Sequence, residues 1–515
     1  MLEKLRDLRG LIGSRVDHPL ADSRELRRIV KEIPADNAFR ALDEIVGWLE
    51  SASQAPDFPE DRLYLAVSQL DDAAQAHLRR LAREYLTSPR LSRTEEKRLW
   101  EINHGFWAVL AAAYERCLPA AGQRGKAGEQ MREVLPAFSV GLISALGNLL
   151  KWQQFHYEPA AGSLWQRLGA ALLAADEAGL AAQAVALRSR GAGVFSAQRE
   201  YAKWVAFHAA SMDGLLPLQI ELGERLIAHF AGAFSFSPAV EHDSVYWVDL
   251  TLPQPPLRMA QMPDHAGRTQ RFFKPGAGHQ GIERLLHALE KGGEVPAEIN
   301  LGGQYYAPGL VPILRHLATY LAPVPPQRRH PRHPVNQRVF VAHGMGDAYL
   351  AVAGRLAGQQ DEARVESWVV ENISRGGFGA VLHTVPGDWL KVGALIAMQP
   401  EGGAGWQVGV VRRFVRVGDT EARVGIEMLA RWPEAVDLRV RAASSYSAAP
   451  GTPALLIAEG CPPGEIRAVL PREAFDVREV MECIREGRRQ LLTPVAMIEA
   501  AADFDFVRYR LAAAG

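Results

Sequence analysis

Two short polar stretches in the C-terminal third of the chain, separated by about forty residues, decide how the sequence is interpreted. Residues 326–332 read Pro-Gln-Arg-Arg-His-Pro-Arg, and residues 372–378 read Asn-Ile-Ser-Arg-Gly-Gly-Phe. The first stretch is an arginine cluster flanked by prolines and contains the pattern RxxxR. The second is a small polar turn between two apolar runs and contains the pattern NxSxxG.

Runs of β-type residues, punctuated by glycine and proline, surround the second stretch. Such a pattern is typical of a compact barrel or sandwich. The strands that we expect here are 338–342, 366–371, 379–383, 393–398, 406–415 and 422–429. A second β-rich segment is predicted further on, with strands at 454–457 and 466–470, a short helix at 477–486 and an edge strand at 504–509.

The N-terminal part of the chain is predicted to be α-helical. Ser92 and Glu95 have the spacing of a capping box and precede an apolar stripe at helical intervals. Asp36 is expected to cap an earlier helix. The uncharged apolar run 134–150 contains Pro136 and is shorter than a typical membrane span, so a buried helix is expected there.

These patterns predict a multidomain α+β protein, because 515 residues exceed one ordinary core. An α-helical region is followed by an antiparallel β-barrel and a small C-terminal β-rich segment. The predicted ranges are 1–235 for the α-helical domain, 236–322 for a small α+β element, 323–333 for a Pro/Arg linker, 334–440 for the barrel and 441–515 for the C-terminal segment.

The composition is ordinary for a soluble globular protein, with 48% hydrophobic and 23% charged residues. The formal net charge is −1, which argues against a general nucleic-acid or membrane-surface role. The three cysteines lie far apart and lack CxxC spacing. We therefore expect a cytoplasmic protein with no metal site and no disulfide framework.

One segment of this globally neutral chain is locally positive. No aspartate or glutamate occurs from residue 299 to residue 346, and this stretch includes Arg328, Arg329 and Arg332. The planar guanidinium group binds a phosphate or the O6/N7 edge of guanine through two parallel hydrogen bonds. It also stacks on base faces. The segment is therefore suited to an anionic guanine ligand.

The polar turn offers complementary groups. Asn372 and Ser374 lie two positions apart, so in an extended segment both side chains point to the same side. Their amide and hydroxyl can hydrogen-bond a base edge or a phosphate oxygen. Gly376 and Gly377 are expected to permit positive φ and a close backbone approach.

Together, the two motifs in their strand context resemble the PilZ family, small β-barrels that bind the bacterial messenger cyclic di-GMP. The resemblance covers residues 327–435 and implies a ligand site but no catalytic residues. By motif position it implies guanine and phosphate contacts from Arg328 and Arg332, with Arg329 as a helper. It further implies a guanine-edge contact from Asn372, a phosphate or base contact from Ser374, and a close turn at Gly377.

The spacing between the motifs departs from the family pattern. Forty positions separate Arg332 from Asn372, which is longer than usual for the family. The excess, residues 345–364, is expected to form a helical insertion in the first hairpin. Such an insertion could crowd the ligand site or serve a partner.

Two functions from different classes remain open. The first is a cytoplasmic cyclic di-GMP receptor that reorients its helical region toward an unidentified protein partner in motility, secretion or biofilm control, with no nucleic-acid binding and no membrane insertion. The alternative is an adaptor or scaffold whose PilZ-like barrel does not bind nucleotide. The motifs of cyclic di-GMP synthesis and breakdown are absent, and the GxGxxG match at 276–281 follows no buried strand. We therefore do not expect an enzyme.

Overall fold

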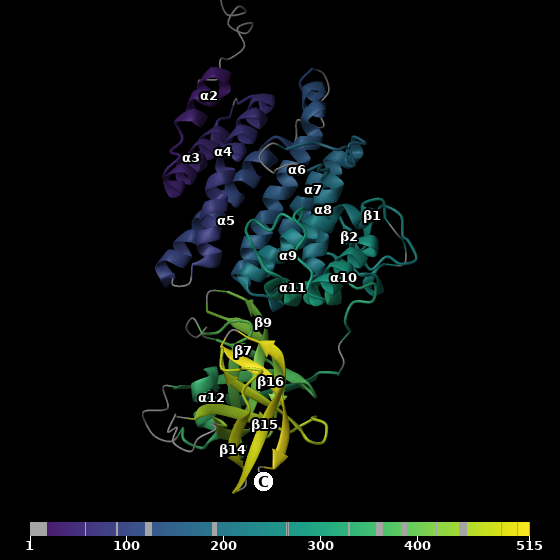
Figure 1. Cartoon of the computed structure of the whole chain (residues 1–515). Coiled ribbons are helices and arrows are strands. Elements are labelled where there is room, and N and C mark those ends of the chain that lie inside the picture. The colour runs from purple at the N-terminus through teal and green to yellow at the C-terminus, as the bar shows by residue number, and fades with distance from the viewer. Residues whose placement is uncertain are drawn as a thin grey trace, which may run out of the picture. The chain divides into compact units, whose positions relative to one another are not determined.

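The computed structural model describes most of the chain (Figure 1). The described residues are 18–513 without 57, 89–90, 119–125, 188–192, 264, 266, 328–329, 357–363, 384–388, 419, 442–450, 486 and 502. The chain divides into two compact units, which are treated separately below. The first unit comprises 1–156, 160–212 and 217–326, and the second comprises 157–159, 213–216 and 327–515.

The first unit is mainly helical, and helices that follow one another in the chain pack side by side (Figure 1). Its helices are α2 (Ser23–Glu32), α3 (Ala38–Gln54), α4 (Glu60–Thr87), α5 (Arg93–Arg116), α6 (Lys126–Phe155), α7 (Gly162–Glu177), α8 (Ala197–Ala209), α9 (Pro217–Phe230), α10 (Gly276–Glu290) and α11 (Ala307–Tyr320). Short 3-10 helices occur at η1 (Pro19–Ala21), η4 (Met212–Gly214), η5 (Ala231–Ala233) and η6 (Met259–Gln261).

Local capping sets where two of these helices begin. The capping box is confirmed at α5, where Ser92 Oγ accepts from the Glu95 backbone N–H and the Glu95 carboxylate accepts from the Ser92 N–H. The expected cap at Asp36 is wrong by one residue. Asn37 caps α3, since its side chain accepts from the Arg40 backbone N–H at 3.1 Å.

Helix α6 forms the centre of the first unit. Its residues from Leu135 to Leu150 are almost all buried, as expected for a helix that is apolar on every side. A Cβ on Gly147 would lie 1.8 Å from the Trp204 ring, so this glycine allows α8 to pack closely. Among the described residues, the segment Arg132–Phe155 alone is long and apolar enough to cross a membrane, and 78% of its most apolar window is buried within the protein.

A small antiparallel sheet completes the first unit. It has the strand order β1-β4-β2-β3, with β1 (Ser235–Ser237), β2 (Tyr246–Asp249), β3 (Leu257–Arg258) and β4 (Gln270–Lys274). Phe272 and Phe273 of β4 are buried, and only Pro275 separates β4 from α10, so the expectation that no buried strand precedes the GxGxxG match at 276–281 is wrong. Helix α11 follows α10 in the chain. The unit ends at Pro326, whose carbonyl oxygen accepts a hydrogen bond from the Arg258 guanidinium at 3.1 Å.

The second unit begins with a closed six-stranded barrel. The strand order is β10-β7-β6-β5-β8-β9, and every neighbouring pair with a described register is antiparallel. The strands are β5 (His333–His343), β6 (Val365–Ser374), β7 (Gly377–Leu382), β8 (Leu395–Pro400), β9 (Gln407–Arg416) and β10 (Ala422–Ala430). Inward residues such as Val341, Ile396 and Val411 are fully buried and fill the barrel.

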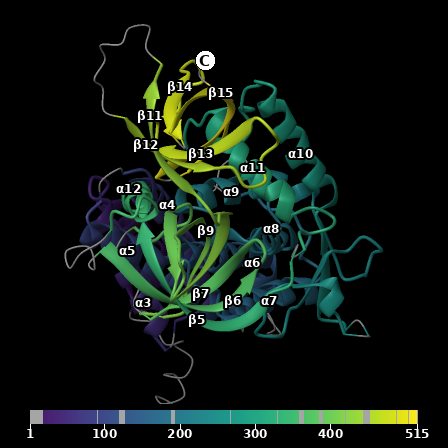
Figure 2. The same ribbon diagram turned by 90° about the horizontal axis from the view of Figure 1, so that it is seen from below.

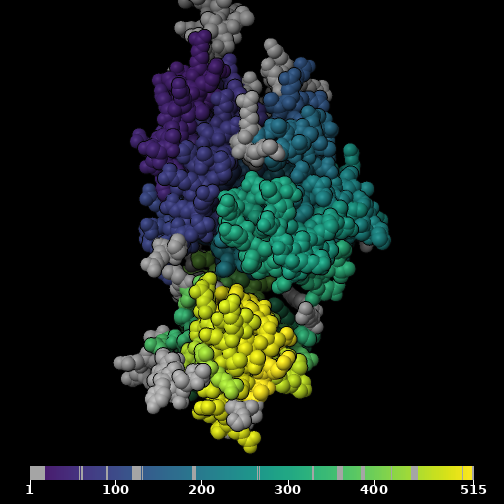
Figure 3. All heavy atoms as spheres, viewed as in Figure 1, coloured from purple at the N-terminus to yellow at the C-terminus, as the bar shows by residue number. Residues whose placement is uncertain are grey.

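The C-terminal segment is a second closed barrel, with the order β11-β12-β13-β16-β15-β14 (Figure 2). Its strands are β11 (Glu434–Val440), β12 (Thr452–Ile457), β13 (Glu465–Pro471), β14 (Met481–Arg485), β15 (Arg488–Ala500) and β16 (Phe504–Ala513). In the space-filling view the atoms of this barrel, coloured yellow, form one compact body (Figure 3).

Three details of the second barrel differ from the sequence expectations. Strand β11, which the sequence placed at the end of the first barrel, pairs with β12 and β14 of the second. The predicted helix at 477–486 is wrong, because 481–485 form strand β14 with Met481 and Cys483 facing the core. The predicted strand at 504–509 is confirmed as part of β16, but it is not an edge strand, because β16 pairs with both β13 and β15.

Helix α12 (Gly344–Val352) lies between the two barrels of the second unit (Figure 2). Its residues Met345 and Ala348 share one apolar cluster with Leu395 of the first barrel and Phe504 of the second. The Arg412 guanidinium on β9 also forms a bidentate pair with the Glu499 carboxylate on β15, at 2.5 and 2.6 Å. The expected helical insertion therefore joins the barrels.

A chain of buried ion pairs crosses the interior of the first unit. Lys151 Nζ contacts Glu221 at 2.7 Å and Glu224 at 3.3 Å, and Lys203 Nζ contacts Glu224 at 3.1 Å. Burial alone would raise the pKa of Glu224, yet the neighbouring positive charges, above all Lys151, hold it well below its usual range. The neighbouring lysines thus keep the Glu224 carboxylate charged. We name this set the buried charge chain; its members are Arg225, Glu221, Lys151, Glu224, Lys203 and Glu200.

We expect the Glu224→Gln substitution to lower the free energy of unfolding of the helical unit by about 3–5 kcal/mol, because it leaves two buried lysines short of a counter-charge. Urea unfolding followed by the helical circular dichroism signal measures this change. The control is Glu101→Gln, whose carboxylate lies 3.7 Å from Lys97 at the exposed surface of α5, and which should cost at most about 1 kcal/mol. Equal effects of the two substitutions would contradict the role assigned to the chain.

Candidate ligand site on the first barrel

The NxSxxG motif forms the hairpin between β6 and β7. Ser374 ends β6 and Gly377 begins β7, and the two residues pair directly across the hairpin. Arg375 and Gly376 form the exposed two-residue turn between them. The turn is held from its other side because the Gly376 carbonyl oxygen accepts from the Met428 backbone N–H at 3.0 Å.

The pairing of β5 with β6 brings the end of the arginine motif to this hairpin. His333 pairs with Ile373 and Pro334 pairs with Asn372. Continuing the antiparallel register by one residue places the exposed Arg332 opposite Ser374. His330 lies close as well, since a Cβ on Gly376 would be 3.8 Å from its ring. Residues distant in sequence thus meet at one edge of the barrel.

Asn372 carries an unsatisfied polar atom at this edge. Its side chain lies across Gly379, where an added Cβ would be 2.8 Å from Nδ2. A β-bulge separates it from Val370 and changes the register at this point. Its Oδ1 is buried and has no hydrogen-bond partner among the described residues. Leaving such a group unpaired costs roughly 1–3 kcal/mol, so a ligand that pairs it gains that much in affinity.

The other motif residues shape the turn. Ser374 Oγ donates to the Gly377 carbonyl oxygen at 3.1 Å, which orients the half-buried hydroxyl. Gly377 is needed for close approach, because a Cβ there would lie 1.9 Å from the Ile426 carbonyl oxygen. The expected positive φ is found at Gly377, where φ is 159°, and it is absent at Gly376.

Arg328 and Arg329 lie outside the described residues, so the structure does not place these two predicted ligand contacts. The motif residues that it brings together are Arg332, Asn372, Ser374 and Gly377. The insertion that could have crowded the site instead forms α12, which packs against β5, β8, β11 and β12.

Arg431 and Trp432 lie outside both motifs, and the Arg431 side chain lies near the hairpin. The Arg431 guanidinium donates to the Arg375 carbonyl oxygen at 3.5 Å, and Trp432 is 74% exposed. The backbone N–H groups of Arg431 and Trp432 donate to the Glu459 carboxylate, at 2.8 and 2.5 Å respectively. The Arg431 guanidinium next to the turn can stack on a flat base. The Trp432 ring lies 3.8 Å from a Cβ built on Gly405, in the connection between β8 and β9. The sequence signal was an Arg-Trp-Pro run directly after the last barrel strand.

The described residues contain no group of three or more His, Cys, Asp or Glu side chains arranged to hold a metal ion. The site instead consists of arginines, an amide, a hydroxyl and closely approached backbone. These groups bind oxyanions and base edges and carry out no bond-breaking chemistry by themselves.

A closed six-stranded barrel with an arginine at the start of one strand and an Asn-x-Ser turn beside it defines a PilZ-type nucleotide-messenger domain. Comparison of the sequence with protein-family models agrees with this assignment. Residues 24–240 match the model of the cyclic di-GMP receptor FimW, N-terminal domain, and residues 352–435 match that of the FimW middle PilZ domain.

Together the two matches cover more than half of the chain, which belongs to the FimW family of cyclic di-GMP receptors. The family comprises messenger receptors and not enzymes. The PilZ match includes Asn372, Ser374 and Gly377 and begins after Arg332. A search of curated proteins found no match.

We expect Gly377→Ala to destabilise the first barrel by about 1–3 kcal/mol, because the new methyl group collides with the Ile426 backbone. Gly376→Ala is the matched control one residue away, where the nearest atom is 3.8 Å from the new Cβ. Thermal unfolding followed by near-ultraviolet circular dichroism compares the two variants. A Gly376→Ala protein that loses as much stability as Gly377→Ala would contradict the described hairpin geometry.

Proposed function

We propose that this chain binds cyclic di-GMP at the edge of the first barrel formed by the start of β5 and the β6–β7 hairpin. Arg332 contacts phosphate or guanine, Asn372 pairs a guanine edge, Ser374 bonds a phosphate or base, and Gly377 keeps the turn close. The unpaired Asn372 Oδ1 carries this proposal, because a guanine edge supplies the N–H donors that it lacks. Arg328 and Arg329 add the remaining contacts from the arginine segment.

We also propose that ligand binding is transmitted to the helical unit. The boundary between the two units falls between Pro326 and Gln327, directly before the arginine motif. A ligand that holds residues 328–332 against the hairpin therefore acts on one of the covalent connections between the units. This biases an equilibrium between arrangements of the two units. The helical unit then gains or loses a protein partner in the cytoplasm. This change controls motility, secretion or biofilm formation.

We expect Arg332→Ala and Asn372→Ala each to weaken cyclic di-GMP binding roughly tenfold or more, because a good bidentate contact is worth about 1–3 kcal/mol. Isothermal titration calorimetry of the whole chain, with GTP as the control ligand, measures this loss. Arg338→Ala is the matched control, since Arg338 is exposed on the same strand and pairs with Val369, away from the hairpin. Unchanged affinity in both test variants would overturn the site, and the chain would then be a scaffold with a PilZ barrel.

Transmission is tested by solution X-ray scattering with and without saturating cyclic di-GMP. We expect the ligand to change the radius of gyration of the wild-type chain. The same addition should leave the Arg332→Ala chain unchanged, because that variant lacks the contact between linker and hairpin. Identical scattering of the wild-type chain in both conditions, with binding verified by calorimetry, would contradict transmission while leaving the ligand site intact.

A further inference from the structure

A cavity of roughly 960 Å³ lies within the helical unit, apart from the barrel site. It is lined by residues of α4, α5, α6, α8 and α9 and by the segment 298–305. Its size is at the upper end of the range for sites that enclose small organic molecules. The elements that line it belong to one compact unit, so its geometry is set by the packing of that unit.

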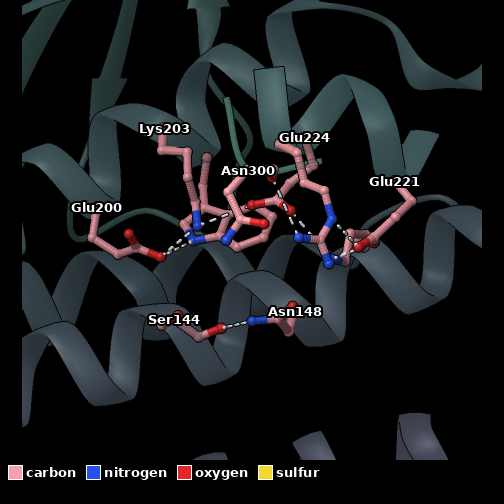
Figure 4. Close-up of polar contacts among 10 residues, drawn as sticks. Ser144, Asn148, Glu200, Lys203, Glu221, Glu224 and Asn300 are labelled. Carbon is pink, nitrogen blue, oxygen red and sulfur yellow. Dashed lines mark hydrogen bonds and ion pairs between the residues drawn. The ribbon is translucent and has the colours of Figure 1, made fainter. Parts of the chain in front are cut away.

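All six members of the buried charge chain line this cavity. Figure 4 shows polar contacts among them and their neighbours. Glu200 and Lys203 come from α8, and Glu221 and Glu224 from α9, with Asn300 beside them. Five members of the chain are only 5–8% exposed. Because they neutralise one another, this part of the lining is polar and rigid without requiring a bound counter-ion.

The lining as a whole carries more positive than negative charge. Among the described lining residues, six carry a positive charge and four carry a carboxylate. Arg83 and Arg199 lie outside the buried charge chain, and their hydrogen bonds go to backbone carbonyl oxygens of Gly302 and Val194, at 3.1 and 3.0 Å. A carbonyl oxygen satisfies a donor but does not neutralise a guanidinium charge. The cavity therefore favours an anion.

The deep part of the cavity offers an acceptor and flat apolar surfaces. Asn103 is fully buried and lines the cavity, and its Nδ2 donates to the Leu99 carbonyl oxygen at 2.8 Å. Its Oδ1 has no hydrogen-bond partner among the described residues. A buried acceptor without a partner points to a guest that donates an N–H or O–H. Trp107 and Trp152, both buried, line the same cavity.

We propose that this cavity binds a small organic anion: a molecule with a carboxylate or phosphate group, a flat apolar body and at least one N–H or O–H donor. Arg83 and Arg199 bind the anionic group. The body lies among the tryptophans, and the donor pairs Asn103 Oδ1. The helical unit is thus a second ligand-binding module, separate from the messenger site on the barrel.

Charge-matched probes test this proposal on the full-length chain by calorimetry. Indole-3-acetate and adenosine monophosphate are the anionic probes, and indole-3-acetamide and adenosine are their neutral counterparts. All titrations use the Arg332→Ala background, so that nucleotide binding at the barrel does not contribute. We expect at least one anion to bind saturably and about tenfold or more tighter than its neutral counterpart. The preference of each anion over its own neutral counterpart shows whether the cavity recognises the carboxylate or the phosphate.

A matched pair of variants places the binding in the cavity. Arg83 and Arg80 are both exposed on α4, and each donates one 3.1 Å hydrogen bond to a backbone carbonyl oxygen, but only Arg83 lines the cavity. Arg83→Gln should lower the affinity for the anion roughly tenfold, and Arg80→Gln should leave that affinity unchanged. No saturable binding by either anion, no preference over the neutral probes, or equal affinity in the two variants would each overturn the proposal.

Discussion

The pairing of β5 with β6 is the constraint on which the proposed messenger site depends. It closes the first barrel, and by the same register it sets the start of the arginine-bearing strand against the polar hairpin. A slip of one residue would turn the side chains of β5 to the opposite face and carry Arg332 away from Ser374. The hydrophobic interior of the barrel prevents that slip, because Val339 and Val341 must face inward. Barrel packing therefore positions the ligand residues.

The two units solve the problem of placing polar groups inside a protein in different ways. In the barrel, the polar groups lie at an edge, and Asn372 has an acceptor there with no partner among the described residues. In the helical unit, six charged groups neutralise one another in the interior, and a cavity opens beside them. The first arrangement suits a ligand that supplies the missing donors. The second gives a rigid polar wall whose surroundings carry surplus positive charge.

Much of this architecture could be predicted from local sequence signals. The capping box at Ser92, the buried run in α6 and the strands of the first barrel are set by neighbours in the sequence, so periodicity reveals them. The sequence predicts a helix where β14 forms, because five residues contain too few buried positions to tell the spacing of a strand from that of a helix. The buried charge chain could not be foreseen, since Lys151 and Glu224 lie 73 positions apart and meet only through helix packing. Arg431 and Trp432 likewise gain their significance from the fold.

A crystal structure of the whole chain with cyclic di-GMP is the most direct test of the messenger site. The account predicts a guanine edge within hydrogen-bonding distance of Asn372 Oδ1 and a ligand phosphate or guanine at the Arg332 guanidinium. It also predicts that the ligand meets both the β6–β7 hairpin and the segment that enters β5. A ligand bound elsewhere, with Asn372 Oδ1 still unpaired, would contradict the claim that register and hairpin together create the site.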